Sequence, residues 1–308
     1  MNNPTTNLLG RRNVLALLGG VAAAALLSAR RARAEGAAAS ALAFDGDVLV
    51  AAGAQVWRHD LSGGAVPLPA PRTPIRALAC HPDRPGRLFA ALQDGGLDRS
   101  DDGGRTWRTA SGGLPQTQVT AVAIAAGAPD TVYAAIAEDG LWRSEDAGEN
   151  WSFMMDRPWL DEAERDPLTL ASVDLETGMG GIWIYAGTEK GLTRVPDCFC
   201  RWQDVQPGNA MDALVAGDAP LAENPLPAGE PVLSLASAPT APSTLYAALP
   251  SGVWASQDGG VVWTHKAEGQ GRAVAVHPQD ENHVSALLDG TLKLSRDAGA
   301  TWTAITVA

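Results

Sequence analysis

The chain has few of the residues that stabilise a fold covalently or anchor it in a lipid bilayer. Its 3 cysteines in 308 residues are too few for a disulfide framework, so the fold must depend on packing. No stretch beyond the N-terminal region reads as a transmembrane span. Charged residues make up only 19%, whereas the 33 glycines and 21 prolines are typical of many short strands joined by tight turns.

The N-terminal region carries an export pattern. The pair Arg11-Arg12 precedes a mildly apolar stretch that ends near Leu27, and Ala32-Arg33-Ala34 has the Ala-x-Ala form of a cleavage site. The paired arginines resemble a twin-arginine signal. We therefore predict a signal peptide over residues 1–34 and one domain over residues 35–308, exported in folded form to the periplasm or the exterior. The alternative is an uncleaved membrane anchor.

The expected exported domain is strongly acidic. Removing residues 1–34 takes away five arginines and no acid, which changes the formal net charge from −12 to −17. Such a surface repels phosphate backbones and anionic lipids, so we predict no nucleic-acid partner and no membrane-surface role. It favours basic proteins or metal cations, and it also helps to keep an exported protein soluble.

A nine-residue segment recurs along the chain, first as Arg99–Trp107. Four copies fit the pattern Ser-x-Asp-x-Gly-x-x-Trp, and we call each of these a Ser-Asp turn. Their defining residues are Ser100, Asp102, Gly104 and Trp107; Ser144, Asp146, Gly148 and Trp151; Ser256, Asp258, Gly260 and Trp263; and Ser295, Asp297, Gly299 and Trp302. A fifth, degenerate copy keeps only Asp197 and Trp202, and a sixth, near the start of the chain, keeps only Trp57-Arg58.

Two strand-like elements precede the copies. The nearer one reads Leu88-Phe-Ala-Ala or Val132-Tyr-Ala-Ala, and the farther one alternates apolar and small residues, as in Ala77-Leu-Ala-Cys. Each unit then amounts to four short strands, and such units repeating every forty to fifty residues or so are typical of propeller blades. The sequence therefore predicts an all-β fold, a single β-propeller of four-stranded antiparallel blades. Six blades are favoured, and the stretch 210–230 leaves a seventh open.

The Ser-Asp turns resemble the Asp-box repeat, also called the bacterial neuraminidase repeat. The fuller pattern, with Tyr-Ala-Ala and Gly-Leu-Trp-Arg ahead of the turn, resembles the propellers related to photosystem II assembly factors. The resemblance extends from about Leu42 to the end of the chain. It implies the propeller fold but no particular activity, because the repeat occurs in glycosidases, sorting receptors and assembly factors.

The recurring residues have an architectural interpretation. In each turn the Asp accepts hydrogen bonds from turn amides, the Ser hydroxyl ties to the Asp, the Gly supplies a positive φ, and the Trp packs between blades. The aspartates could instead be metal ligands or catalytic acids. We favour the architectural role, because a role repeated on every blade is what a structural part has, and we predict no metal and no cofactor.

A sialidase-like enzyme would need a tyrosine nucleophile. The three tyrosines, Tyr133, Tyr185 and Tyr246, all occupy the repeat position at which Phe89 stands in another blade. A position that accepts Phe serves packing, so we expect no sialidase activity. A glycoside hydrolase that uses a pair of carboxylates stays open as the alternative function, because 35 acids supply many pairs.

The cysteines divide into two kinds. Cys80 takes a strand position that Ile124 and Leu235 hold elsewhere, which indicates a small buried residue. Cys198 and Cys200 replace the tip of the degenerate turn. They could form a local disulfide, which we favour, or a redox or metal site.

Two connections exceed the normal length of the repeat, Phe153–Pro167 and Gln203–Glu230. Both run from the fourth strand of one blade to the first strand of the next, on the same face as the turns between second and third strands. Insertions on one face of a repeat array commonly build a binding surface. The candidate binding residues are Met154, Met155, Trp159, Leu160, Asp161, Glu162, Asp94, Asp139, Glu189 and Asp289. The alternative is a solvated loop with ordinary acidic turns.

Taken together, these patterns favour a non-enzymatic, exported propeller that acts as a protein-binding or assembly scaffold. The expected partner is another exported or membrane-complex protein.

Overall fold

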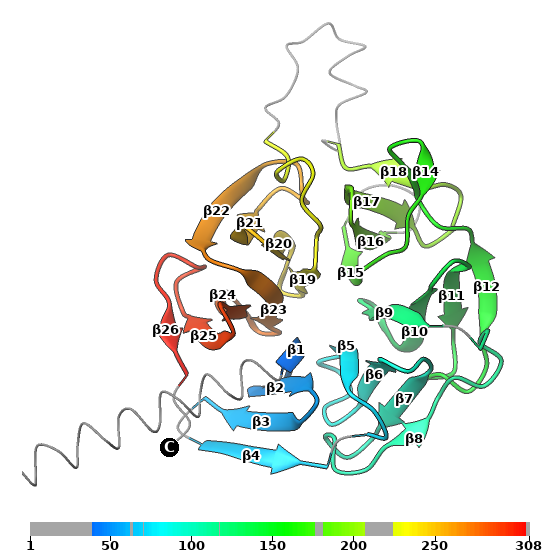
Figure 1. The fold of residues 1–308 in the computed structure, drawn as a ribbon, viewed down its shortest axis with the longest axis horizontal. Coiled ribbons are helices and arrows are strands. Elements are labelled where there is room, and N and C mark those ends of the chain that lie inside the picture. The colour runs from blue at the N-terminus through cyan, green and yellow to red at the C-terminus, as the bar shows by residue number, and fades with distance from the viewer. Residues whose placement is uncertain are drawn as a thin grey trace, which may run out of the picture.

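The computed structural model describes residues 39–61, 64–69, 71–116, 118–175, 181–206 and 224–305. Over these residues the chain consists of six four-stranded antiparallel sheets arranged around a central axis, together with one short hairpin (Figure 1). None of the described residues forms a helix long and apolar enough to cross a membrane. The expected signal peptide, and residues 207–223 of the second long connection, lie outside the described residues.

Each blade is built from four consecutive strands. The first three blades are β1 (Ala39–Asp45), β2 (Val48–Gly53), β3 (Val56–Asp60) and β4 (Gly64–Leu68); β5 (Ile75–Cys80), β6 (Leu88–Leu92), β7 (Leu97–Ser100) and β8 (Arg108–Thr109); and β9 (Val119–Ala125), β10 (Ala128–Ile136), β11 (Gly140–Ser144) and β12 (Ser152–Met155). The last three are β15 (Thr169–Asp174), β16 (Ile182–Thr188), β17 (Gly191–Pro196) and β18 (Gln203–Asp204); β19 (Ser234–Ala238), β20 (Ala241–Leu249), β21 (Gly252–Ser256) and β22 (Trp263–Glu268); and β23 (Gly271–His277), β24 (Asp280–Leu288), β25 (Thr291–Ser295) and β26 (Thr303–Ala304).

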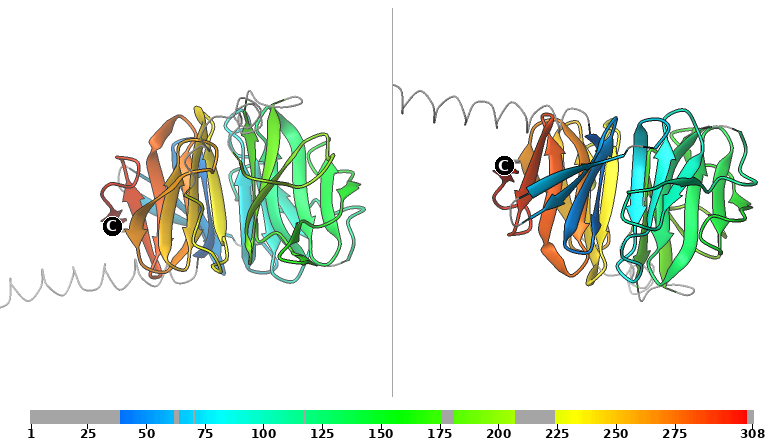
Figure 2. Two further views of the ribbon diagram at one scale, coloured as in Figure 1. Left: turned by 90° about the horizontal axis from the view of Figure 1, so that it is seen from above. Right: turned by 90° about the horizontal axis from the view of Figure 1, so that it is seen from below.

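The first strand of every blade lies at the centre of the ring, and the fourth lies at the rim (Figure 1). Figure 2 shows the ring edge-on, with the strands running between its two faces. The all-β class, the four-stranded blades and the count of six blades are thereby confirmed.

The second strand of a blade explains why the repeat is so apolar. In β6, Leu88, Ala90 and Leu92 pack towards the first blade, whereas Phe89 and Ala91 pack towards the third. Successive side chains of a strand point to opposite faces, so a strand between two neighbouring blades needs an apolar residue at every position. All five residues of β6 are buried.

The core is divided among the blade interfaces. Six buried apolar clusters occur among the described residues, and each combines side chains of two neighbouring blades. At the interface that closes the ring, Phe44 of the first blade lies edge-on to His277 and His283 of the last, and His277 Nε2 lies 3.0 Å from Asp47 Oδ1. Side-chain packing therefore joins the last blade to the first, since each described sheet is made from one run of four successive strands.

Candidate functional site

Each Ser-Asp turn is held by its own polar groups. In the first, Ser100 Oγ donates to Asp102 Oδ1 at 2.9 Å and accepts from Gly104 N at 2.8 Å. Asp102 also accepts from the amide and the hydroxyl of Thr106, at 2.8 and 2.7 Å. The same Ser-to-Asp and Gly-to-Ser bonds recur in the other three turns. The carboxylates are therefore occupied by the turn itself.

These bonds lower the pKa of three of the aspartates. The hydroxyl of Thr106, with its amide, lowers the pKa of Asp102 to about 2. Asn150 and Thr301 lower the pKa of Asp146 and Asp297, respectively, to about 2 in the same way. A carboxylate that stays ionised at such low pH is a poor general acid.

Acid should weaken the Ser-Asp turns. The folded pKa of Asp102, Asp146 and Asp297 lies below the ordinary value, so the stability that they contribute is present above about pH 4 and is lost as the pH falls towards 2. We expect the melting temperature to fall between pH 5 and pH 2. The Asp102→Asn/Asp146→Asn/Asp297→Asn variant should lose less over the same interval. If the melting temperatures of the two proteins fell equally between pH 5 and pH 2, the three aspartates would not be the cause of the acid sensitivity.

Three of the recurring tryptophans join their blade to the one before it. Trp151 Nε1 donates to Ala110 O at 2.9 Å, and Trp202 Nε1 donates to Asp156 O at 2.8 Å, both in the preceding blade. Trp263 is fully buried in the cluster between the fourth and fifth blades. These side chains pack between blades and do not point into water.

The three tyrosines are buried packing residues. Burial raises the pKa of the Tyr133 and Tyr185 hydroxyls, and it raises the pKa of Tyr246 to about 12. Tyr185 and Tyr246 donate to the backbone oxygens of Gly259 and Glu281, respectively. None of the three is placed as an accessible nucleophile.

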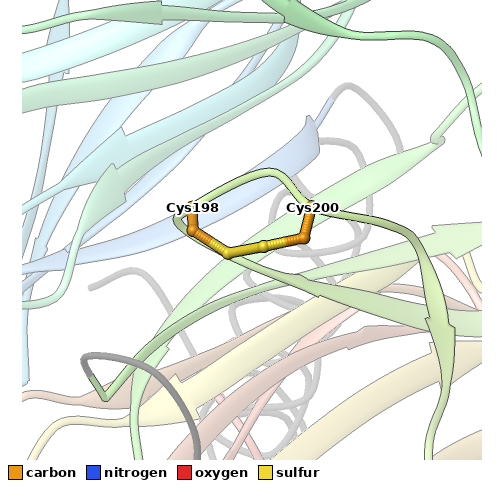
Figure 3. Close-up of a disulfide and its surroundings, with 2 residues drawn as sticks. All are labelled: Cys198 and Cys200. Carbon is orange, nitrogen blue, oxygen red and sulfur yellow. A yellow bond between two sulfur atoms is a disulfide. The ribbon is translucent and has the colours of Figure 1, made fainter.

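A disulfide closes the degenerate turn of the fourth blade (Figure 3). Cys198 and Cys200 have their Cα atoms 5.5 Å apart, and Phe199 between them has φ of 52°. The Phe199 ring packs edge-on to Tyr133 of the third blade, with centroids 6.1 Å apart. Where the other turns use Ser and Asp hydrogen bonds, this turn is held by a covalent bond and an aromatic contact. Over the described residues, no three His, Cys, Asp or Glu side chains are grouped as a metal site would need.

The two faces of the ring carry different connections. The tips of the Ser-Asp turns bond to the connection between first and second strands of the same blade or to the start of the second strand. Gly103 N donates to Gly86 O at 2.8 Å, and Ala298 N donates to Asn282 O at 2.9 Å. These two kinds of connection therefore share one face. The turns between second and third strands lie on the opposite face.

The first long connection forms a small hairpin on that opposite face. Strands β13 (Trp159–Leu160) and β14 (Ala163–Glu164) pair across a turn made by Asp161 and Glu162. Both turn residues have positive φ, 52° and 61°, which costs about 1–3 kcal/mol for a residue other than glycine. Trp159 is 67% exposed. A strained turn that presents an exposed tryptophan is the most distinctive surface feature among the described residues.

Ion pairs fasten this hairpin to a turn of the fourth blade, and a hydrogen bond joins the same connection to a turn of the third. Arg165 Nη1 lies 2.7 Å from Glu189 Oε1, and Lys190 Nζ lies 3.1 Å from Asp161 Oδ2, both linking the hairpin to the β16–β17 turn. On the other side, Glu138 N donates to Asp166 Oδ1 at 2.9 Å. The hairpin is thus held in one position on this face.

The structure brings together only some of the binding residues that the sequence predicts. Trp159, Leu160, Asp161, Glu162 and Glu189 belong to the hairpin and the turn beside it, and we call these five residues the hairpin surface.

The other candidates lie elsewhere. Met154 and Met155 are half-buried on β12. Asp94, Asp139 and Asp289 each bind a group of their own blade: Thr73 Oγ1, Trp142 Nε1 and Gln270 N, respectively. Sequence reasoning missed Arg165 and Lys190, although the density of acids around them was a signal.

The central channel contains a cavity of about 320 Å³. One level of its wall is a ring of six alanines, one from each first strand: Ala43, Ala79, Ala123, Ala171, Ala236 and Ala275. The titratable side chains that line the cavity, among the described residues, are Arg76, Cys80, His81 and Asp174. It therefore holds a single carboxylate.

Comparisons with known proteins find the fold. No protein-family model matches the chain, and no curated protein matches its sequence. The GH74 xyloglucanase from Xanthomonas campestris is 20% identical over 85% of this chain and 45% of its own, with a TM-score of 0.54. A GH74 enzyme from Niastella koreensis is 16% identical over 87% of this chain and 45% of its own, with a TM-score of 0.58.

The chain thus spans 45% of the length of each of these two GH74 enzymes. YCF48 bound to a D1 peptide is 14% identical over 88% of this chain and 77% of its own, with a TM-score of 0.46. At these identities a likeness concerns the fold alone. The chain is a six-bladed β-propeller that shares its architecture with the GH74 enzymes.

Proposed function

We propose that the chain is an exported, non-enzymatic scaffold that binds another protein through the hairpin surface. The observation that carries the proposal is Trp159, which is 67% exposed on a strained hairpin tied to two blades. Export to the periplasm or the exterior is proposed from the twin-arginine pattern of residues 1–34.

The physical basis is pre-organisation. Tryptophan is among the side chains that most often dominate binding energy at protein interfaces. Holding it on a hairpin fixed by Arg165 and Lys190 reduces the entropy that binding would otherwise cost. The acidic tip, Asp161 and Glu162, favours a basic surface around the partner's apolar pocket.

The fold is shared by hydrolases and by binding proteins, so it favours neither function. A glycoside hydrolase needs two carboxylates about 5–9.5 Å apart across its substrate. The described lining of the channel cavity supplies only Asp174. The aspartates of the Ser-Asp turns are engaged in their own turns. These observations support binding over hydrolysis.

Capture experiments test the proposal. Residues 35–308 are immobilised and exposed to an extract of exported proteins, and the proteins retained by the wild type are compared with those retained by Trp159→Ala. Loss of a tryptophan hot spot typically costs at least ~2 kcal/mol, so affinity for the identified partner should fall about thirtyfold, measured by surface plasmon resonance. Asp161→Lys/Glu162→Lys should mainly slow association, and more so at low salt.

The matched control is Val66→Ala, which truncates an exposed side chain of another blade, β4. It should leave partner recovery unchanged. Equal recovery by the wild type and both hairpin variants would remove the hairpin surface from the function. Turnover of chromogenic glycosides that disappears in Asp174→Asn would favour the hydrolase instead.

A further inference from the structure

The mouth of the central channel is shaped by β-bulges. In β1, β5, β9 and β23 the pairing with the next strand shifts by one residue near the start of the strand, and the extra residues are Ser40, Arg76, Thr120 and Arg272. Every blade repeats the same strand order, so these strands all start on one face of the ring. Bulges re-aim side chains and are over-represented beside functional sites.

Arg76 is an unusual member of this set. It is half-buried and lines the cavity, its Nε is buried without a hydrogen-bond partner, and among the described residues no carboxylate pairs with it. By contrast Arg72, four residues earlier, lies 3.7 Å from Asp94 and 3.4 Å from Asp98. A half-buried guanidinium without a carboxylate partner costs free energy, which an anionic ligand bound to its Nη atoms would recover.

The groups around Arg76 do not supply that anion. The hydroxyls of Ser40 and Thr120, on the neighbouring blades, donate to the backbone oxygens of Ile75 and Ala135, respectively. Asp174, the carboxylate on the cavity wall, ends β15, whereas Arg76 lies at the start of β5. The two charges are therefore at opposite ends of the channel.

Most other residues of the wall are apolar, and its serine and threonine hydroxyls are bonded to backbone groups, as Ser234 is to the oxygen of Val274. Leu168 and Leu233, which come directly before β15 and β19, line the cavity from the blades across the channel, and the alanine ring lies deeper. The volume of about 320 Å³ lies at the lower end of the range of small-molecule pockets, about 300–1,000 Å³. A cationic group at one edge, with leucine and alanine side chains beyond it, is the complement of an amphiphilic anion.

We propose that the central cavity binds a small monocarboxylic acid with an apolar body, its carboxylate paired with Arg76 and its body against Leu168, Leu233 and the alanine ring. A guanidinium binds a carboxylate through two parallel N–H···O bonds, which gives both affinity and orientation. This site is separate from the hairpin surface and does not depend on the protein-binding proposal.

Calorimetric titration of residues 35–308 with octanoate, and with octanamide as its uncharged counterpart, tests the proposal. Octanoate should bind saturably at one site, and octanamide at least about tenfold more weakly, because only the carboxylate can pair with the guanidinium. Arg76→Gln should lose about tenfold or more in affinity for octanoate. Arg76→Lys keeps the positive charge but loses the two parallel N–H donors, so its affinity should lie between those of the wild type and Arg76→Gln.

Arg296→Gln is the matched control, since Arg296 is exposed on the Ser-Asp turn of the last blade, on the face opposite the bulges. It should bind octanoate like the wild type. The octanoate-to-octanamide ratio on the wild type needs no variant, so a folding defect in Arg76→Gln cannot hide the result. No saturable octanoate binding, equal binding of octanamide, or unchanged binding in a folded Arg76→Gln would each overturn the proposal. The hairpin variant Trp159→Ala should bind octanoate normally.

Discussion

Replacing Trp263 with alanine is expected to destabilise the propeller by about 3–5 kcal/mol, the usual cost of truncating a buried tryptophan. Trp263 is 1% exposed and lies in the cluster that joins the fourth and fifth blades. Its Nε1 donates to Gly260 O at 2.8 Å, so the ring is also fixed in orientation. The truncation would open a cavity between two blades, and neither blade can close it without moving the other.

Urea unfolding of Trp263→Ala and the wild type measures the difference. Trp159→Ala is the natural control, because it removes the same side chain from a position that is 67% exposed. We expect its free energy of unfolding to stay within about 0.5 kcal/mol of the wild type. Similar losses for the two variants would mean that the recurring tryptophans do not hold the blades together.

Substituting Gly252 by alanine should cost about 4 kcal/mol, through two effects that add. Gly252 begins β21 with φ of +135°, a conformation that costs other residues about 1–3 kcal/mol. A Cβ there would also lie 1.9 Å from the backbone oxygen of Ala267 in the neighbouring strand β22. Overpacking against backbone typically costs a further 1–3 kcal/mol or so, because the strand pairing itself has to shift.

Gly191 allows the two effects to be separated. It begins β17 at the equivalent turn of the fourth blade with φ of +129°, but a Cβ there would meet nothing within 4 Å. Gly191→Ala should therefore show the backbone strain alone, about 2 kcal/mol. Thermal and urea unfolding of the two variants should differ by about 1–3 kcal/mol. Equal losses would show that the contact with Ala267 relaxes without cost.

The sequence predicted the repeat because its signals are local. Ser100 bonds to Asp102 two residues away and to Gly104 four residues away, so the spacing of these residues in the sequence predicts the turn directly. The unbroken apolar run of β6 likewise indicates a strand that is buried on both faces. A tyrosine position that also accepts Phe89 indicated packing, and Tyr133, Tyr185 and Tyr246 are buried.

The candidate site was less accessible from sequence. The long connection and its exposed Trp159 could be named from the length of the repeat, whereas the acids Asp94, Asp139 and Asp289 were grouped with them only because they share a face. In the structure each of these three acids binds a group of its own blade, and the side chains that hold the hairpin are Arg165 and Lys190.

The sequence by itself determined the all-β class and the four-stranded unit, because these follow from period-two patterning and from bonds within a few residues, and it favoured six blades over seven. Only the tertiary structure decided which side chains hold the hairpin in place, how the blade count resolved to six, and which arginine lines the channel. The contact of Arg165 with Glu189 spans 24 residues, and Arg76 reaches the cavity through a bulge that shifts one residue of register. Such contacts arise when separate blades close into a ring, and no short-range pattern encodes them.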